Sequence, residues 1–153
     1  MLEQAIGRLS TDLAVDLGTC NTRVFVRGRG ITIEAPSVVA TDRTAGGRVV
    51  AVGEEAKRML GRTPEHITAI SPIRDGVIAD FALAEALLRD CVEGAVPGRR
   101  LVRPSIVICV PQATSDVERR AVQEFARAVG ARQVHLIAKS VAAAIGAELP
   151  VHE

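Results

Sequence analysis

A cluster of polar and small residues lies in a short turn that directly follows a predicted strand. The strand ends at Asp16, and the residues that come after it include Gly18, Thr19, Asn21 and Thr22. A carboxylate at a strand end can hold a metal-bound water, and a glycine lets backbone N–H groups approach phosphate oxygens closely. Hydroxyl and amide groups add hydrogen-bond donors. The pattern indicates a phosphate-binding turn; the alternative is a simple Asx-type hairpin turn, which the same residue types also build.

Other common catalytic and nucleotide-binding patterns are absent from the sequence. It has no lysine-bearing P-loop and no G-x-G-x-x-G segment, so the commoner nucleotide loops are excluded. A two-metal nuclease needs several converging carboxylates, and Asp16 has no obvious companions on neighbouring strands. There is no G-x-S-x-G elbow either. The three cysteines have no zinc-ligand spacing, and we expect reduced, mostly buried thiols: they are Cys20, Cys91 and Cys109.

Composition narrows the class of protein. The chain has 153 residues, of which 48% are hydrophobic, and this predicts one packed domain of 12–153 after a short leading segment. Nineteen basic residues balance 18 acidic ones, so charge gives no reason to expect nucleic acid as a partner. No apolar run reaches the length of a membrane-spanning helix, and no signal peptide opens the chain. We therefore expect a soluble, cytoplasmic protein.

The first half of the sequence predicts a meander of strands followed by an insertion. Two alternating strands flank Gly28 and Gly30, which is a hairpin signature. After more extended pieces, a helix is expected from Glu54 to Leu60. A second helix is expected from about Phe81 to Val92, with a buried stripe at helical spacing. That stripe consists of Phe81, Ala84, Leu88, Cys91 and Val92.

The second half alternates between strands and helices. A continuous β-branched run at Ser105–Val110 is typical of a strand covered on both faces. The capping box of Ser115 and Glu118 opens a helix whose apolar side carries Val117, Ala121, Val122, Phe125 and Val129. Gly130 ends it, residues 133–138 form the next strand, and Ser140 is expected to cap the last helix. The order predicts an α/β fold, similar to ribonuclease-H-like folds, in which an antiparallel part of a mixed sheet joins a parallel part.

The first eleven residues have the pattern of a short amphipathic helix. Leu2, Ile6 and Leu9 fall on one face, together with Ala5. Such a segment can lie on a membrane surface, but it has little positive charge to attract anionic lipid. A terminal segment that docks on its own domain is the alternative, and the sequence leaves both open.

Several longer segments resemble one known family. The sequences of 12–31, 34–40, 51–81, 107–111, 117–122 and 142–151 look like those of the bacterial rod-shape-determining MreB family. That family belongs to the superfamily of actin, heat-shock chaperone ATPases and sugar kinases. The resemblance implies the actin-like version of this fold, with helices on both faces of the mixed sheet and a small inserted subdomain at about 33–74. It covers nearly the whole chain.

The resemblance also implies a site and a function. Asp16 would hold a Mg²⁺ ion through water, and Gly18, Thr19, Cys20, Asn21 and Thr22 would line the phosphates of ATP. Cys20 replaces an alanine usual in the family. The family forms ATP-driven, membrane-apposed double filaments that guide cell-wall synthesis and determine cell shape. Full-length subunits of this type and the cell-wall elongation machinery are therefore the expected partners.

The sequence departs from the family pattern in two ways. A full-length relative would continue with a second phosphate loop and domain II, so these 153 residues provide one wall of a two-walled cleft. Losing half the nucleotide contacts weakens binding steeply, since about 1.4 kcal/mol is a factor of ten in affinity. The second departure is Lys139, which stands where the family has its water-positioning glutamate. A lysine cation cannot accept a proton from water.

These departures leave three functional hypotheses. The first is a half-length cytoskeletal protein that keeps subunit contacts without hydrolysing ATP alone, with Lys139 as an ordinary surface lysine. The second is an ATPase that completes its cleft with a second chain, where Lys139 could attract phosphate as a point charge. The third is a degenerate remnant that folds poorly.

Overall fold

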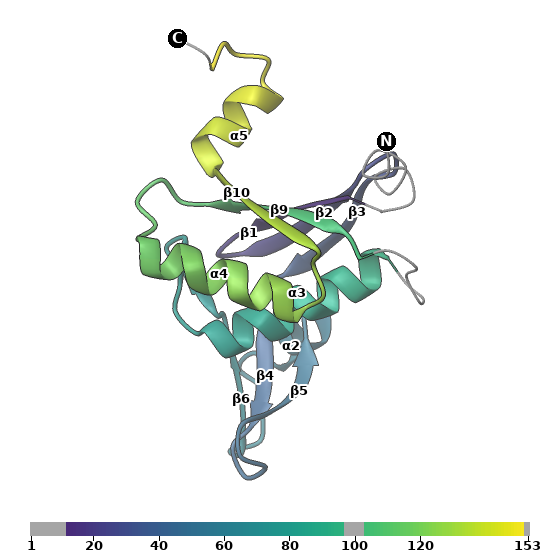
Figure 1. Cartoon of the computed structure of the whole chain (residues 1–153). Helices are drawn as coiled ribbons and strands as arrows, with labels where there is room; N and C mark the ends of the chain where they lie inside the picture. The colour runs from purple at the N-terminus through teal and green to yellow at the C-terminus, as the bar shows by residue number, and fades with distance from the viewer. Residues whose placement is uncertain (1–11, 97–102, 152–153) are drawn as a thin grey trace.

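The computed structural model describes residues 12–96 and 103–151 (Figure 1). The described strands are β1 Leu13–Leu17, β2 Asn21–Val26, β3 Gly30–Pro36, β4 Val39–Asp42, β5 Arg48–Val52, β6 Ile67–Ile70, β7 Ile73–Arg74, β8 Val77–Ile78, β9 Ser105–Val110 and β10 Gln133–Ala138. The described helices are α2 Glu54–Met59, α3 Phe81–Ala95, α4 Asp116–Ala128 and α5 Lys139–Gly146.

The main sheet has five strands in the order β10-β9-β1-β2-β3. The pairs β1–β2 and β2–β3 are antiparallel, whereas β9 runs parallel to both β1 and β10. The chain reverses between β2 and β3 at Gly28, which has a φ of 79° that favours glycine. The predicted sheet, with an antiparallel part joined to a parallel part, is confirmed.

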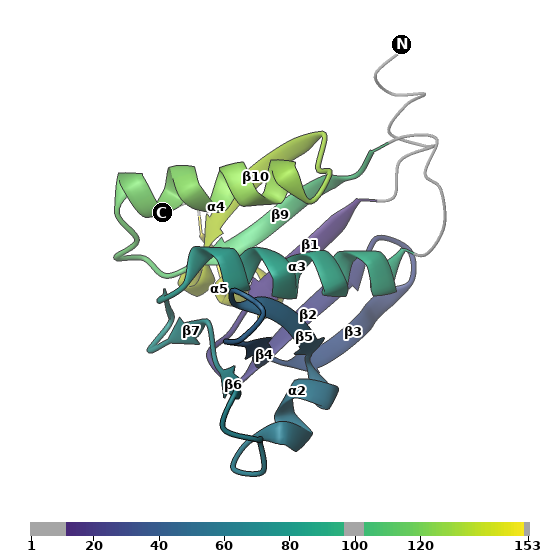
Figure 2. The same cartoon turned by 90° about the horizontal axis from the view of Figure 1, so that it is seen from below.

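One face of this sheet is covered by α3 and α4. Figures 1 and 2 show both helices on the same side, and the core lies between them and the sheet. Alternate residues of β1 point into this core because successive side chains of a strand face opposite ways; they are Leu13, Val15 and Leu17. The intervening residues of β1 point to the opposite face of the sheet. Among the described elements, no pair of helices covers that face as α3 and α4 cover the first.

Two residues expected in the buried stripes are exposed. Phe81 is 39% exposed because it opens α3 before the first fully buried residue of that helix, Ala84. Val117 is 78% exposed. At 100° per residue, Val117 lies about 140° around α4 from the buried Val122, which places it away from the core.

The helix ends follow their capping residues, with one exception. The predicted capping box of α4 is confirmed: the N–H of Ser115 donates to Glu118 Oε2 at 2.8 Å, and the N–H of Glu118 donates back to Ser115 Oγ. The prediction that Ser140 caps the last helix is wrong. The helix α5 begins at Lys139, directly after β10, so Ser140 already lies in its first turn and Ala138 is the N-cap.

Residues 39–70 form a separate, smaller layer. The strands β5-β4-β6 make a three-stranded sheet that packs with α2 around its own cluster of buried side chains, which includes Val38, Ala40, Ala51 and Ala56. Figure 1 shows this layer on the far side of α3 from the main sheet. The short hairpin β7–β8 then leads back to α3.

The last helix, α5, leaves the end of β10 on the side of the sheet opposite α3 and α4 (Figures 1 and 2). None of its residues is buried, although its sequence is largely apolar. Within 12–96 and 103–151, no helix has the length and apolar character needed to cross a membrane. The predicted amphipathic segment 1–11, with Leu2, Ile6 and Leu9, lies outside the described residues.

Candidate functional site

The predicted phosphate turn joins β1 to β2 at one edge of the main sheet. Because β1, β9 and β10 are parallel, their carboxyl ends meet at this edge. Asp16 is paired in register with Cys109 of β9, and β10 ends at Ala138 beside Val110. The turn, the end of β9 and the start of α5 are therefore neighbours in space.

Gly18 is required by the tight closure of this turn. Its N–H donates to the carbonyl oxygen of Asn21 at 3.2 Å. A Cβ atom at position 18 would lie 2.4 Å from that same oxygen, which is closer than real side chains come. Within the described chain, the backbone N–H groups of Thr19 and Cys20 take part in no hydrogen bond. They are the groups of the turn that can donate to an anion.

Thr22 was predicted to contact phosphate, but the structure places it in the interior. Its side chain is 0% exposed, and its Oγ1 lies 2.9 Å from Ser37 Oγ. Ser37 Oγ donates its only proton to the carbonyl oxygen of Gly18 at 2.6 Å. Thr22 is therefore the donor to Ser37. These two hydrogen bonds link the buried hydroxyl groups to the backbone of the turn and hold it from the interior side.

Ser37 itself was not identified from the sequence as a site residue. Its N–H donates to the carbonyl oxygen of Cys20, so both its backbone and its side chain hold the turn. The only available signal was a polar residue after Pro36, at the end of an otherwise half-buried strand. That signal does not indicate which segment the serine contacts.

Thr19 connects the turn to the β7–β8 hairpin. Its Oγ1 accepts a hydrogen bond from the N–H of Gly76 at 2.9 Å. The hairpin turns at Asp75 and Gly76, both with positive φ, which fits the two-residue turn that an Asp-Gly pair favours. The hydroxyl of Thr19 is thus engaged with the protein, whereas Cys20 is exposed and Asn21 is half-buried.

The carboxylate of Asp16 faces the ammonium group of Lys139. Asp16 Oδ1 lies 2.9 Å from Lys139 Nζ, and Nζ also donates to the carbonyl oxygen of Leu17 at 2.8 Å. Oδ1 is a buried atom whose contact with Nζ is an ion pair without good hydrogen-bond geometry. The side chain of Lys139 is 33% exposed. The interpretation of Lys139 as an ordinary surface lysine is wrong, because the side chain bridges α5 to the end of β1.

Charged and thiol groups flank this pair along the open sheet face. Arg23 is the cross-strand neighbour of Asp16, and it pairs with Glu34 at 2.7 Å. Burial raises the pKa of the Cys109 thiol; Asp16 raises it further, and Lys139 opposes the rise. In the described ranges, no group of three His, Cys, Asp or Glu side chains is placed to hold a metal ion.

The cysteines divide by position. Cys91 is buried in α3, and burial raises the pKa of its thiol to about 12. Cys109 is half-buried, and Cys20 is exposed at the tip of the turn. The expectation that the thiols are mostly buried therefore fails at Cys20, which lies in a loop outside the packed layers.

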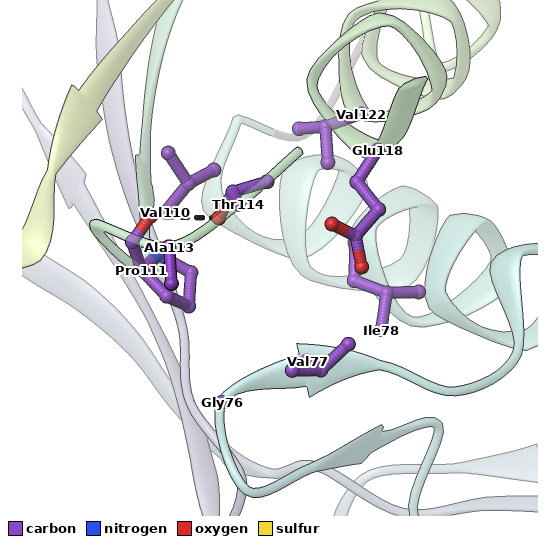
Figure 3. Close-up of a pocket in the computed structure, with 9 residues that line it drawn as sticks. All are labelled: Gly76, Val77, Ile78, Val110, Pro111, Ala113, Thr114, Glu118 and Val122. Carbon is purple, nitrogen blue, oxygen red and sulfur yellow. Dashed lines mark hydrogen bonds between the residues drawn. The ribbon is translucent and has the colours of Figure 1, made fainter. Parts of the chain in front are cut away.

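A small apolar pocket lies next to the turn. It has a volume of about 120 Å³ and opens between Gly76 and Val77 of the hairpin and the start of α4 (Figure 3). Figure 3 also shows the carboxylate of Glu118 at its side, and this carboxylate is held by the capping box. The pKa of Glu118 is lowered, first by the hydrogen bond from the Ser115 hydroxyl. The pocket is therefore a mostly apolar hollow beside the Thr19 contact.

Comparison with known proteins identifies the family. A sequence model described as "MreB/Mbl protein" matches residues 10–153. The chain belongs to the MreB/Mbl family. The cell shape-determining protein MreB of Escherichia coli K12 is 49% identical over 158 aligned positions, which cover 100% of this chain and 45% of the relative. The chain thus spans less than half the length of this relative.

Solved structures confirm the actin-like fold of this MreB/Mbl chain. The MreB5 protein of Spiroplasma citri, crystallised with ADP bound, superposes with a TM-score of 0.81 at 28% identity, over 92% of this chain and 41% of that one. The subunit of the MamK double helical filament superposes with a TM-score of 0.75 at 26% identity, over 91% and 44% of the two chains.

Proposed function

We propose that this chain acts in cell-shape determination as part of an actin-like cytoskeleton and that it works through contacts with MreB-type subunits. The observation that carries the proposal is the match of the whole of this chain to part of the cell shape-determining protein MreB. The related MamK chain is described as part of a double helical filament. Assembly with like subunits is therefore the proposed activity of these 153 residues.

Exposed apolar side chains support an assembling role. Val141 and Ile145 of α5 and the nearby Leu149 are exposed, although α5 is largely apolar. On the uncovered face of the main sheet, Phe25 and Ile31 are also exposed. Clustered apolar surface of this kind marks a place where another polypeptide packs. We propose that α5 and this sheet face are covered in the assembled state by MreB-type polypeptide.

We further propose that the turn contributes one wall of a nucleotide site. The N–H groups of Thr19 and Cys20 would donate to phosphate oxygens, and Asn21 would add its amide, as Gly18 allows close approach. Thr22 would support the turn without touching the ligand. Because contacts from one wall are few, ATP would bind weakly to the chain alone.

ATP hydrolysis by the chain alone is not part of the proposed activity. A general base must accept a proton from the attacking water. Lys139 stands at the family's glutamate position, and its ammonium group donates to Leu17 and faces Asp16. An ammonium group has no lone pair to accept a proton, so this position cannot supply the base.

The proposed location is the cytoplasm, at the inner face of the cell membrane. The cell-wall elongation machinery is the proposed further partner, and Leu2, Ile6 and Leu9 are the proposed contacts with lipid. An amphipathic helix of this length would bind a membrane weakly and reversibly. A vesicle-flotation assay that compares the full chain with one lacking residues 1–11 tests this.

Co-sedimentation with a full-length MreB tests the assembly role. The full chain should enter the pellet with polymerised MreB. Ile145→Glu should remove it from the pellet, because the new charge lies on the exposed apolar side of α5. Val117→Glu is the matched control: it also places a charge at an exposed apolar position, on α4. Absence of the unmodified chain from the pellet would contradict the proposal.

Equilibrium titration with ATP separates the two functional classes. A dissociation constant in the millimolar range or above agrees with a single wall. Micromolar binding by the purified chain would instead favour a nucleotide-binding enzyme whose cleft is completed by a second chain.

A further inference from the structure

The ammonium group of Lys139 is held by two atoms at the end of β1. Nζ lies 2.9 Å from Asp16 Oδ1 and donates to the carbonyl oxygen of Leu17 at 2.8 Å. The hydrogen bond to Leu17 joins positions 122 residues apart in the sequence. Lys139 is also the first residue of α5, so its backbone is fixed by the helix that follows β10. A side chain anchored at both ends places its charge at a defined point.

The atom that Lys139 faces is the one that a cation would need. Asp16 Oδ1 is buried, and within the described chain it has no hydrogen-bond donor. The Asp16 side chain as a whole is 40% exposed, but an ionised oxygen that is itself shielded from water is stabilised by a positive partner. The ammonium group supplies that charge at contact distance, in the position where the family resemblance calls for a hydrated Mg²⁺ ion.

The groups around Asp16 do not form a second cation site. On β2, its neighbour Arg23 is itself a cation and is paired with Glu34. On β9, its neighbour is the thiol of Cys109, a soft sulfur group that does not suit Mg²⁺, which prefers oxygen ligands. Mg²⁺ is bound through carboxylates and several retained waters. The donor set at Asp16 therefore does not fit Mg²⁺.

We infer that the ammonium group of Lys139 takes the place of the divalent cation at Asp16, so that this turn carries its own positive charge and binds no Mg²⁺. The inference rests on Asp16–Cys20 being the family's phosphate turn and is independent of filament assembly. The Glu-to-Lys difference then has a local structural role. It converts a carboxylate that would serve a hydrated ion into one half of an internal ion pair.

Manganese binding to the full chain tests this inference, with Mn²⁺ as a paramagnetic probe. In NMR spectra, the backbone amide signals of Gly18 and Cys20 should not broaden selectively when Mn²⁺ is added to the unmodified chain. In Lys139→Glu, two carboxylates face each other, so the same signals should broaden and the apparent affinity should rise about tenfold or more. The gain should disappear in the double variant Asp16→Asn, Lys139→Glu. Lys57→Glu is the matched control, because Lys57 is exposed on α2 and is the only other lysine.

Two results would overturn the inference. One is selective Mn²⁺ broadening at Gly18 and Cys20 in the unmodified chain that Asp16→Asn removes. The other is that Lys139→Glu binds Mn²⁺ no more tightly than the unmodified chain, including the case in which neither chain binds Mn²⁺ detectably. If Lys139→Glu does not fold, Lys139→Gln removes the positive charge with a side chain of similar polarity and should still raise Mn²⁺ affinity. Co-sedimentation is measured separately, so failure of the metal result and failure of the assembly role are distinguishable.

Discussion

The hydroxyl group of Ser37 donates a hydrogen bond to the carbonyl oxygen of Gly18 at 2.6 Å. The same oxygen of Ser37 accepts from the hydroxyl of Thr22, 2.9 Å away, and both side chains are fully buried. The link between β3 and β4 therefore holds the shape of the turn between β1 and β2. The turn between β1 and β2 is thus not a free loop, because buried hydroxyl groups hold its backbone in place.

Ser37→Ala is expected to destabilise the chain through this hydrogen-bond chain. The substitution leaves the Thr22 hydroxyl without its acceptor in the interior. An unsatisfied buried polar group costs about 1–3 kcal/mol. Chemical denaturation followed by circular dichroism measures the free energy of unfolding. The turn amides, seen by NMR, should shift as well.

A double-mutant cycle with Thr22→Val measures the interaction free energy between Thr22 and Ser37 separately from the effect of each single substitution on stability. If the hydroxyl groups stabilise each other, then Thr22→Val should cost less in the Ser37→Ala background than in the unmodified chain. A coupling of about 0.5–1.5 kcal/mol is expected. Strict additivity of the two substitutions would mean that the Thr22–Ser37 contact contributes nothing to stability.

Alkylation of Cys109 reports the charges of the ion pair. Asp16 raises the pKa of the Cys109 thiol and Lys139 lowers it, on top of the dominant effect of burial. The thiolate is the reactive form. At a fixed pH near 8, Asp16→Asn should therefore speed the reaction of Cys109 with iodoacetamide, and Lys139→Gln should slow it. Because the thiolate fraction changes tenfold for each pKa unit, the two rates report the direction of each charge effect.

Peptide mass spectrometry assigns the alkylation rates to individual cysteines. Cys20 is exposed and should react fastest, whereas Cys91 is buried with a pKa of about 12 and serves as the slow reference. The opposite signs at Asp16 and Lys139 are the decisive result. If both substitutions speed the reaction, the cause is a loosened fold and not the charges.

The elements that depend on local pattern were predictable from the sequence. The hairpin at Gly28, the strand Ser105–Val110 and the capping box at Ser115 each have a signal within a few residues, and each of these elements is confirmed. The expectation that this strand is covered on both faces is wrong, because its residues alternate between buried and half-buried. The error at Ser140 also has a local cause. A capping residue is recognised by its type, but the position at which β10 ends decided where α5 begins.

The contacts that build the site were not predictable in this way. Lys139 was recognised as a departure from the family, but its position in the sequence gives no sign that it reaches Asp16. The parallel pairing of β9 with β1 and β10 brings these residues to one sheet edge. Likewise, Thr22 has the side chain of a phosphate ligand, and only its burial shows that it faces inward. Long-range pairing therefore decides which polar groups are available to a ligand.

Acid should weaken the start of α4 through Glu118. Hydrogen bonds from Ser115 lower the pKa of Glu118 below its ordinary value of 4.5. The ionised carboxylate then adds stability that is fully present above about pH 4.5 and is lost as the pH falls through the lowered pKa. Melting temperatures measured between about pH 6 and pH 3 should therefore fall less steeply in Glu118→Gln than in the unmodified chain.

Glu124→Gln is the control for the acid effect. Glu124 is an exposed glutamate later in the same helix, outside the capping box. Its replacement should leave the fall of melting temperature with decreasing pH close to that of the unmodified chain. An equal reduction of this fall in both variants would indicate a general charge effect on α4 and would remove the role assigned to the capping box.

Gly18→Ala tests whether the closure of the turn requires glycine. The added Cβ would lie 2.4 Å from the carbonyl oxygen of Asn21, and a backbone atom cannot move aside as a flexible side chain can. The turn must open, at an expected cost of about 1–3 kcal/mol in unfolding free energy. Gly146→Ala is the control, because nothing lies within 4 Å of its added Cβ and alanine favours a helix. If the two variants unfold at the same denaturant concentration, Gly18 is not held by the close approach to Asn21, and the turn is free to adopt other shapes.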